Sequence, residues 1–514
     1  MTDVLWLLVF AQMMMGGFDT LYHHEGTQRL AWRPGQAAEL RLHGVRNLAY
    51  ALLFMALGWT TPQGLWAWAL IVLVAGEMVI TLWDFVEEDR SRLLPATERV
   101  IHTLLTLNYG AILALLIPAL WKQAGQPTAL PPAWHGLMSW FCLIAAVGVI
   151  LSGLRDLAAA ARCKRIAPAD AAPLAEALAD AAHVASHADM RHVLVTGGTG
   201  FVGSRLVEAL AGAGHAVTVL TRAKDKAAPL ALHGRVRIID TLDAIADDEP
   251  IDAVVNLAGE AISDSPWTRA KRIRIIRSRL AVTHALVRLI ARLERKPEVL
   301  VSGSAIGIYG LRGDECLQER DEGTACFSSR VCVSWERAAK RARAHGTRVV
   351  LLRTGLVLDN SGGMLARMLT PFEFGLGGRF GHGRQWMSWI HRDDLVRMIV
   401  HCLARTDMQG PVNGTAPEPV TNAGLTAAIG QALHRPALIP VPAAPLRRLL
   451  GGFAEELLLS GQRVLPGVAM DHGFRFLYPE IDSAMAVITG NRAKAQANGQ
   501  GMQLAPAPLQ PGGA

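Results

Sequence analysis

The chain has 514 residues, of which 51% are hydrophobic and 18% are charged, and its formal net charge is +7. Soluble proteins carry about 25% charged residues, so this composition excludes a fully disordered chain and argues against an enzyme that is soluble throughout. Nine of the 13 tryptophans lie before residue 160, which predicts a membrane portion followed by a soluble portion. The positive charge flanks apolar segments or is dispersed, so we expect no nucleic-acid partner. The six cysteines form no CxxC pair, which favours reduced thiols in a cytosolic compartment.

Five apolar stretches are candidates for membrane spans. They cover residues 4–22, 46–59, 65–86, 100–120 and 134–154. A helix needs about 20 apolar residues to cross a hydrocarbon core, so the third stretch is long enough and the second is short. The second stretch either begins earlier, is tilted in the membrane, or forms a re-entrant segment that does not cross it. We therefore predict an all-α transmembrane domain of about five spans over residues 1–157.

Basic residues are distributed unequally among the loops that join these stretches. Arginines are frequent after the first, third and fifth stretches, whereas the other two loops contain only Lys122. Positively charged loops stay in the cytoplasm, so we predict a multi-pass protein of the inner membrane with everything after residue 155 in the cytoplasm. The lipid bilayer is thus a predicted partner. The first residues carry no basic segment, and we expect no cleaved signal peptide.

Eight ionisable residues lie in or near the predicted spans: Asp19, His23, His24, Glu25, His43, Glu77, Asp84 and His102. Charge inside a bilayer is costly and usually functional. One hypothesis is a metal site, or a haem held by the histidines. The other is that these groups pair with nearby arginines or hydrogen-bond inside the bundle. Their spacing matches no metal motif, so no metal ligands are assigned from the sequence.

A strand, a glycine turn and a helix follow the Ala-rich tether of residues 158–190. Residues 192–195 are a short apolar run, TGGTGFVG follows at residues 196–203, and residues 204–213 have a helical pattern. Gly197 permits the tight turn, Gly200 lets the backbone approach a pyrophosphate, and Gly203 lets the helix pack on the strand. Free N–H groups at the helix N-terminus hold phosphate. We predict a dinucleotide-binding domain over residues 191–430.

The residue after the second strand bears on which dinucleotide is bound. This strand is expected at residues 216–220 and is followed by Thr221 and Arg222. An acidic residue about 20 positions after the glycine turn would bind the ribose 2′-hydroxyl of NAD. Arg222 is basic, and a guanidinium suits a 2′-phosphate. The sequence therefore favours NADP; the alternative is that Arg222 is a solvated loop charge and the cofactor is NAD.

Further strands are predicted at residues 236–240, 253–257, 299–302 and 348–353, and a long helix at residues 268–293. Strands that alternate with helices indicate a doubly wound, Rossmann-like parallel sheet, which binds ligands at the carboxyl ends of its strands. The predicted cofactor-binding residues lie at such ends: Gly197, Thr199, Gly200, Phe201, Val202, Gly203, Arg222, Asn256, Leu257, Ala258, Gly259 and Arg353.

Several motifs in the second half of the chain resemble a known group. NLAGE at residues 256–260, SGSAIGIYG at 302–310 and IHRDD at 390–394 resemble the extended short-chain dehydrogenase/reductase superfamily. The motifs WTRAKRIRIIRSRL, LRTGLVLDNSGGML and GRQWMSWIHRDDL resemble, more narrowly, the atypical bacterial YfcH-type "epimerase family" proteins. LLLSGQRVLPG and GFRFLYPEI resemble their C-terminal domain of unknown function. The resemblance covers about residues 192–485, so the first 190 residues are a fusion to it.

The resemblance implies a Rossmann fold that binds NADP or NAD. It implies pyrophosphate contacts from the three glycines of the turn and cofactor walls from residues 256–259. It also implies a small α+β lobe at residues 431–486, which completes the substrate lobe together with residues 360–390. Residues 487–514 are rich in Ala, Gly, Gln and Pro, and we expect them to form a disordered tail.

The catalytic pair of the superfamily, a tyrosine followed four residues later by a lysine, is missing. None of the five tyrosines has a lysine at that spacing, and the expected stretch reads CVSWE. Ser304 is the candidate for the serine that holds the substrate oxygen, with Ser302 as the rival. Tyr309 is the candidate proton donor, or else a packing residue; Glu336, Cys332 and water are the other possible donors.

Three functions are compatible with this sequence. The first is a membrane-tethered, NADP(H)-dependent oxidoreductase or epimerase-like enzyme that acts on a small or lipophilic substrate. The second is an NADP(H)-binding sensor or regulatory module without turnover. The third is a reductase that feeds electrons to a metal or haem in the membrane bundle. We favour the first, because the glycine turn and the strand-end residues have the order of a reductase.

Overall fold

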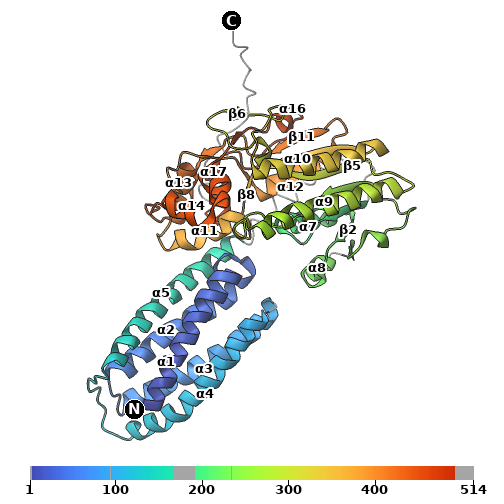
Figure 1. Cartoon of the computed structure of the whole chain (residues 1–514). Helices are drawn as coiled ribbons and strands as arrows, with labels where there is room; N and C mark the ends of the chain where they lie inside the picture. The colour runs from blue at the N-terminus through green and yellow to red at the C-terminus, as the bar shows by residue number, and fades with distance from the viewer. Residues whose placement is uncertain (1–2, 93, 167–191, 233, 492–514) are drawn as a thin grey trace. The chain divides into compact units, whose positions relative to one another are not determined.

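A computed structural model of the chain describes residues 3–92, 94–166, 192–232 and 234–491. The chain divides into two compact units, Met1–Pro168 and Ala169–Ala514. In Figure 1 the first unit is a bundle of long helices, and the second is an α/β unit. Each unit is built differently, because the first contains long apolar segments and the second alternates short strands with amphipathic helices.

The first unit contains five long helices, and each predicted apolar stretch forms most of one of them (Figure 1). They are α1 (Asp3–Phe18), α2 (Ala37–Trp59), α3 (Leu65–Ser91), α4 (Ala96–Ala124) and α5 (Leu137–Ile166). The chain continues from α1 into a π-helical segment, η1 (Asp19–Gln28), in which the backbone hydrogen bonds span five residues instead of four. Two short turns, η2 (Leu30–Trp32) and η3 (Pro34–Gln36), then lead into α2.

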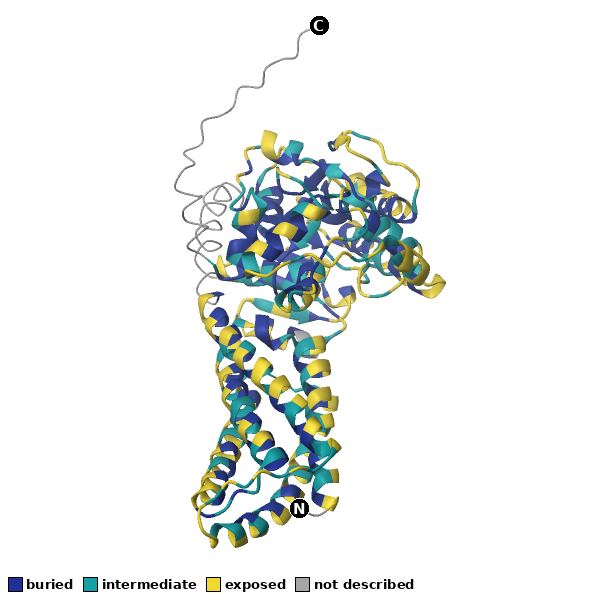
Figure 2. Cartoon of the chain, turned by 90° about the vertical axis from the view of Figure 1, so that its left-hand side faces the viewer, coloured by how far each residue is buried: buried dark blue, intermediate teal, exposed yellow. Residues whose placement is uncertain are grey.

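Among the described residues of this unit, four segments are long and apolar enough to cross a membrane. They are Asp3–Trp32, Leu65–Ser91, Ala96–Ala124 and Leu137–Ile166. Figure 2 shows exposed residues along the outside of the helices, and many of these are large and hydrophobic, such as Leu7, Leu82 and Leu107. A helix surface of this kind is stable when another apolar phase covers it.

The helix α2 is not among the four. It is less apolar because it contains buried polar residues and glycines that contact α5. It begins at Ala37, earlier than the predicted stretch, and its first turns carry the buried Glu39 and His43. A Cβ atom on Gly44 would lie 2.6 Å from Cγ of Leu157, and one on Gly58 would lie 2.6 Å from Cβ of Cys142. These glycines let the backbone of α2 approach α5 closely, so α2 packs against its neighbours rather than presenting an apolar surface all round.

The second unit is built on a seven-stranded sheet with the order β11-β7-β5-β4-β1-β2-β3. All neighbouring strands are parallel. The strands are β1 (His192–Thr196), β2 (Ala216–Leu220), β3 (Val236–Ile239), β4 (Ala253–Asn256), β5 (Val299–Ala305), β7 (Arg348–Thr354) and β11 (Gly410–Gly414). The first six confirm the predicted strands to within a few residues. The strand β11 was missed because its sequence, GPVNG, has no apolar run.

Helices cover both faces of this sheet, which confirms the doubly wound architecture. The side chains of Val193 and Val195 pack with α7 (Phe201–Gly212) and α12 (Arg392–Ala404). Leu194, between them, packs with α9 (Arg269–Arg292) on the opposite face. Successive residues of a strand point to opposite faces, so a continuous apolar run such as VLV fits a strand that is covered on both sides.

Short strand pairs tie the C-terminal lobe to the loops after the sheet. β13 (Arg463–Val464) pairs with β6 (Cys316–Leu317), which follows β5 in the chain. β10 (Trp389–His391) pairs with β8 (Leu356–Leu358), and β12 (Val420–Thr421) pairs with β9 (Trp386–Met387). Residues 431–486, where we predicted a small α+β lobe, contain β13 and α14 (Ala443–Leu450), and α17 (Ile481–Ile488) begins there. The helix α13 (Asn422–Leu433), most of which precedes this range, packs against α17 and α11 (Gly363–Glu373).

Asp394 joins the C-terminal segment to α12, and Asp393 joins α12 to α7. The Asp394 carboxylate accepts the backbone N–H groups of Leu477 at 2.8 Å and Tyr478 at 2.9 Å. Asp393 pairs with Arg205 of α7, with 3.0 Å between Oδ1 and Nε. Both carboxylates are buried, so these contacts are structural.

Two expected boundaries differ from the structure. The helix α5 continues to Ile166 and its last turns bury Cys163 and Ile166, so residues 158–166 of the expected tether belong to this helix. Residues 167–191 lie outside the described residues. The helix α17 ends at Ile488, beyond the expected start of the tail, and residues 492–514 are also outside the described residues.

Candidate functional site

The glycine turn after β1 is held by backbone contacts that leave no room for side chains. Gly197 has a φ of +74°, and a Cβ atom there would lie 2.8 Å from the carbonyl carbon of Leu257. A Cβ atom on Gly203 would lie 2.1 Å from the carbonyl oxygen of Gly197. The N–H of Gly200 donates to that same oxygen at 2.9 Å. The turn therefore brings the start of α7 against the ends of β1 and β4.

The turn lies where the strand order reverses. β2 and β3 follow β1 on one side of the sheet, whereas β4, β5, β7 and β11 lie on the other. Gly197 approaches Leu257 and Ala258 at the boundary between β1 and β4. In open parallel sheets, the crevice at the carboxyl ends beside this boundary is the ligand site.

The N-terminus of α7 is suited to binding an anion. Gly200 precedes the helix in an extended conformation, and no side chain caps the first turn. Gly200 is exposed, and Thr199 and Phe201 are partly buried. Free backbone N–H groups and the helix dipole attract phosphate at this position. Val202 points away from this end and packs against the hydrophobic core.

Arg222 follows β2 at the same edge of the sheet. Its side chain is exposed, and Thr221 beside it is buried. The Oγ1 atoms of Thr221 and Thr199 are 3.4 Å apart, so the end of β2 and the glycine turn are in contact. Arg222 therefore lies at the carboxyl edge of the sheet, directly after β2 and beside the residue that contacts the glycine turn.

Asn256 connects four elements beneath the crevice. It is fully buried; its Oδ1 accepts the Thr196 hydroxyl at 2.8 Å, and its Nδ2 donates to the Thr283 hydroxyl at 2.9 Å. A second contact of Nδ2 reaches the Ser302 hydroxyl at 3.4 Å. The Asn256 side chain thus joins β1, β4, β5 and α9, and the exposed part of the predicted wall is formed by the residues that follow it, such as Gly259.

A second polar group lies at the end of β5, formed by Ser304, Glu336 and Arg353. The Ser304 hydroxyl donates to Oε1 of Glu336 at 2.8 Å. Arg353 donates to the same carboxylate from Nε at 2.9 Å and from an Nη atom at 3.2 Å. All three residues are buried, with exposed fractions of 5%, 3% and 8%. A paired, buried carboxylate that accepts a serine hydroxyl is a candidate proton acceptor.

Tyr309 is buried against Arg353 of this group, and its hydroxyl is not exposed. It is fully buried, its hydroxyl donates to Oδ1 of Asn413 at 2.7 Å, and it accepts from Arg353 at 3.0 Å. Burial raises the pKa of the Tyr309 hydroxyl, although Arg353 opposes the shift. This arrangement favours the packing alternative for Tyr309. Arg353, which we predicted as a cofactor contact, is occupied by Glu336, Tyr309 and the Glu319 carbonyl.

Cys332 and Glu336 lie one turn apart on α10 (Phe327–Lys340), the helix that carries the CVSWE stretch. Burial raises the pKa of the Cys332 thiol to about 11, so this thiol is protonated at neutral pH. The neighbouring Trp335 donates its indole N–H to Thr283 at 3.0 Å and stacks under the Arg279 guanidinium. Among the alternative proton donors, Glu336 is the one held in a charged hydrogen-bond network.

Sequence reasoning missed Asn413 and Glu319 as members of this network. Glu319 Oε1 accepts the backbone N–H of Asn413 at 2.9 Å and that of Val468 at 3.1 Å. Asn413 lies on β11, the strand that the sequence did not reveal, and Glu319 lies in the loop after β6. No local sequence pattern relates these residues. They come into the Arg353 network only when the chain folds.

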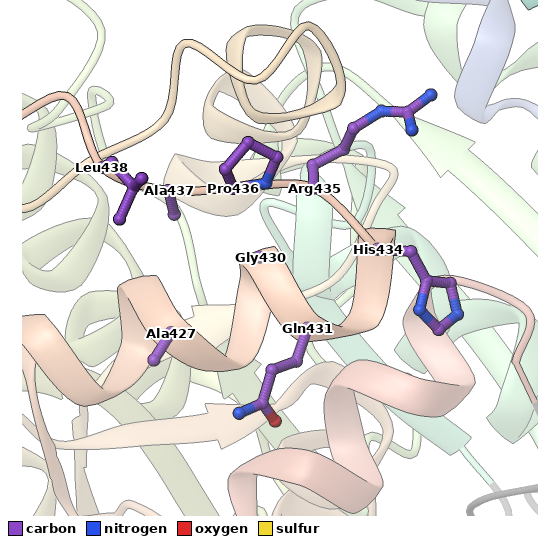
Figure 3. A pocket seen from close by; sticks show the side chains of 8 residues that line it. All are labelled: Ala427, Gly430, Gln431, His434, Arg435, Pro436, Ala437 and Leu438. Carbon is purple, nitrogen blue, oxygen red and sulfur yellow. The ribbon is translucent and has the colours of Figure 1, made fainter.

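A separate hollow of about 570 Å³ lies at the end of α13 (Figure 3). It is lined by Ala427, Gly430, Gln431, His434, Arg435, Pro436, Ala437 and Leu438. None of these residues belongs to the predicted site. The side chains mix apolar and polar groups without a buried charge, so the hollow indicates no particular chemistry.

We predict that Gly203→Ala weakens dinucleotide binding at least tenfold, because its Cβ atom would meet the Gly197 carbonyl and displace α7 from the turn. Gly212→Ala is the matched control: it lies at the other end of the same helix, with nothing within 4 Å of the added atom. Fluorescence titration with NADPH measures both. Equal dissociation constants for the two variants would contradict this role of the turn.

Comparisons with known proteins cover the second unit. The model of the NAD dependent epimerase/dehydratase family matches residues 193–413, and that of a domain of unknown function, DUF1731, matches residues 441–488. An epimerase family protein of Mycobacterium bovis is 39% identical over 298 residues, which are 58% of this chain and 97% of that protein. The chloroplastic SDR39U1 homolog of Arabidopsis thaliana is 40% identical over 301 residues, 58% of this chain and 86% of that protein.

A solved structure agrees with these relatives. The crystal structure of human epimerase family protein SDR39U1 with NADPH is 34% identical, with a TM-score of 0.53. It covers 58% of this chain and 99% of the human chain. The strand order of the sheet and the glycine turn point to the same family as the matched relatives. The chain therefore belongs to the epimerase family, with an extended short-chain dehydrogenase/reductase fold followed by a DUF1731 domain.

Proposed function

We propose that the second unit is an NADP(H)-dependent oxidoreductase or epimerase-like enzyme that acts on a small or lipophilic substrate. The observation that carries this proposal is that the glycine turn and the Ser304–Glu336 group lie at the same edge of the sheet. The glycine turn follows β1, and Ser304 lies at the end of β5, with β4 between them. The human relative whose structure includes NADPH supports the choice of cofactor.

The residues present fit a phosphorylated dinucleotide. Gly197, Gly200 and Gly203 would hold the pyrophosphate at the start of α7, and Arg222 would pair with the 2′-phosphate. Residues 257–259 would form a wall of the cofactor site. The bound nicotinamide would supply or accept the hydride, and the protein would supply the proton transfer.

Ser304 and Glu336 are the groups that we assign to proton transfer. The Ser304 hydroxyl would hold the substrate oxygen and exchange a proton with it. When an alcohol is oxidised, its proton would pass through Ser304 to the Glu336 carboxylate, whose charged form Arg353 stabilises. When NADPH reduces a carbonyl, protonated Glu336 would return that proton through Ser304 to the substrate oxygen. This pair would replace the tyrosine and lysine that the superfamily uses, since Glu336 lies on the helix where that pair would be expected.

The preference for NADPH is tested at Arg222. We expect wild-type protein to bind NADPH at least tenfold more tightly than NADH, because a guanidinium–phosphate contact contributes about 1.5–3 kcal/mol. Arg222→Asp should abolish or reverse that preference. Arg235→Ala, just before the amino end of β3, is the control and should keep it. Titration calorimetry with both nucleotides measures the ratio; an unchanged ratio in Arg222→Asp would remove the NADP assignment.

The catalytic assignment is tested by following NADPH oxidation against quinones, aldehydes and ketones. For the first substrate that turns over, Ser304→Ala and Glu336→Gln should each lower kcat/KM about 100-fold and leave the NADPH dissociation constant unchanged. Ser483→Ala in α17 is the control. Loss in Ser302→Ala but not in Ser304→Ala would assign the rival serine. NADPH binding without turnover on any substrate would support the sensor instead.

We also propose that the first unit anchors the enzyme in the inner membrane, with the second unit in the cytoplasm. The four apolar segments, with α2 as a fifth crossing, support this arrangement, because five crossings keep the three arginine-rich loops on one side of the membrane. A reporter fused after residue 490 should be active in its cytoplasmic form only. The same reporter fused at residue 126, between α4 and α5, should show the opposite compartment. Periplasmic activity of the first fusion would overturn the orientation.

A further inference from the structure

Six ionisable side chains converge at one end of the helical unit. They come from η1, from the start of α2, from the end of α3 and from the start of α4: Asp19, His24, His43, Glu88, Glu98 and His102. We call them the polar cluster. Asp19, His43, Glu88 and Glu98 are at most 5% exposed, and His24 is 8% exposed. Burying this many ionisable groups is unfavourable unless each charge has an opposite charge or a metal ion beside it and each lone pair has a hydrogen-bond donor.

The distances within the polar cluster match those between ligands of one cation. Asp19 Oδ2 lies 3.3 Å from Nε2 of His24 and 3.2 Å from Nε2 of His102. His24 Nε2 lies 3.8 Å from Oε1 of Glu98. One ligand atom from each of these four residues lies within 4.8 Å of all the others. Metal–ligand bonds of about 2.0–2.2 Å in tetrahedral geometry separate ligand atoms by about 3.5 Å.

Two buried imidazole nitrogens without hydrogen bonds independently point to a cation as their partner. Nε2 of His24 and Nε2 of His43 make no hydrogen bond, although carboxylate oxygens of Asp19 and Asp84 lie 3.3 Å and 3.0 Å away. The two rings stack in parallel, with centroids 4.7 Å apart. Two imidazolium cations would repel each other in that stack. Neutral rings would instead direct lone pairs toward carboxylates, which is favourable when a cation lies between them.

Outer contacts orient the ligands in the way that metal sites require. His23 contacts Oδ1 of Asp19 at 2.8 Å, which leaves Oδ2 directed at His24 and His102. Arg92 donates to both oxygens of Glu98, at 2.7 Å and 2.9 Å. Each carboxylate oxygen has a second lone pair, so Glu98 can bind a cation beside Arg92. Such second contacts fix ring and carboxylate orientation around a metal.

We propose that Asp19, His24, Glu98 and His102 bind one divalent first-row transition metal ion. Imidazole and carboxylate ligands without a thiolate are typical of Zn²⁺, Mn²⁺ and Fe²⁺ sites. His43 and Glu88 form an adjoining position that shares His24. An imidazole nitrogen ligates one ion at a time, so the two positions compete and the site holds one ion per chain. This inference goes beyond the proposed function and needs no part of the second unit.

The test uses the full chain, purified in detergent, stripped with a chelator and reloaded with Co²⁺ or Zn²⁺. We expect about one ion per chain after gel filtration, and visible ligand-field bands of Co²⁺ bound through nitrogen and oxygen. His24→Ala and the isosteric Glu98→Gln should each weaken metal binding about 100-fold. His23→Ala should weaken it about 10- to 100-fold, as expected for an orienting contact.

His135→Ala is the matched control, because His135 lies before α5 and its ring contacts Trp6 at a tilt, outside the polar cluster. It should retain the full metal content. Circular dichroism and NADPH titration check that each variant is folded. Less than 0.1 ion per chain in reloaded wild type, or equal metal affinity in wild type, His24→Ala and Glu98→Gln, would overturn the proposal. The first result would assign the polar cluster to protonated imidazoles paired with carboxylates.

Discussion

The close contact between Gly203 and the Gly197 carbonyl is the constraint on which the second unit depends. No side chain fits between these backbones, since an added Cβ atom would lie 2.1 Å from the oxygen. The contact brings the uncapped N-terminus of α7 to the boundary between β1 and β4, where the strand order reverses. Dinucleotide binding, the position of Arg222 and the exposed wall after Asn256 all follow from this arrangement.

In the proposed mechanism, Ser304 and Glu336 would take the role of the tyrosine–lysine pair beside that turn. A tyrosine needs a nearby cation to lose its proton at neutral pH, whereas a glutamate is already a base. Glu336 is buried, and a buried carboxylate is costly unless it is paired. Arg353 supplies the charge, and Tyr309, Asn413 and Glu319 in turn hold Arg353 in place. In the proposal, the network would replace an activated phenol with a carboxylate that Arg353 stabilises.

The helical unit contains buried carboxylates of a different kind. Glu98 is paired with Arg92, but Asp19 contacts imidazoles, whose charge depends on conditions. A bound cation would supply the permanent positive charge that Arg353 supplies in the second unit. Both units thus follow the same rule, that a buried carboxylate needs a positive partner, and they differ in where that partner comes from.

Features that depend on near neighbours could be predicted from the residues alone. Apolar runs such as VLV predicted strands covered on both sides, TGGTGFVG predicted the turn, and long apolar segments predicted the helices of the first unit. The missing tyrosine–lysine pair was also visible, because it is a local spacing. These patterns are reliable since they arise from hydrogen bonding and burial within a few residues.

Only the tertiary structure decided which distant groups meet. Glu88 and Glu98 join His24 because helix packing sets their rotation and depth, and no spacing in the chain encodes that. β11 forms because an edge position of the sheet accepts GPVNG, and with it comes Asn413. Ser304 and Glu336 touch because α10 packs beside β5. Contacts of this kind depend on the summed packing of whole elements, which a single sequence does not display.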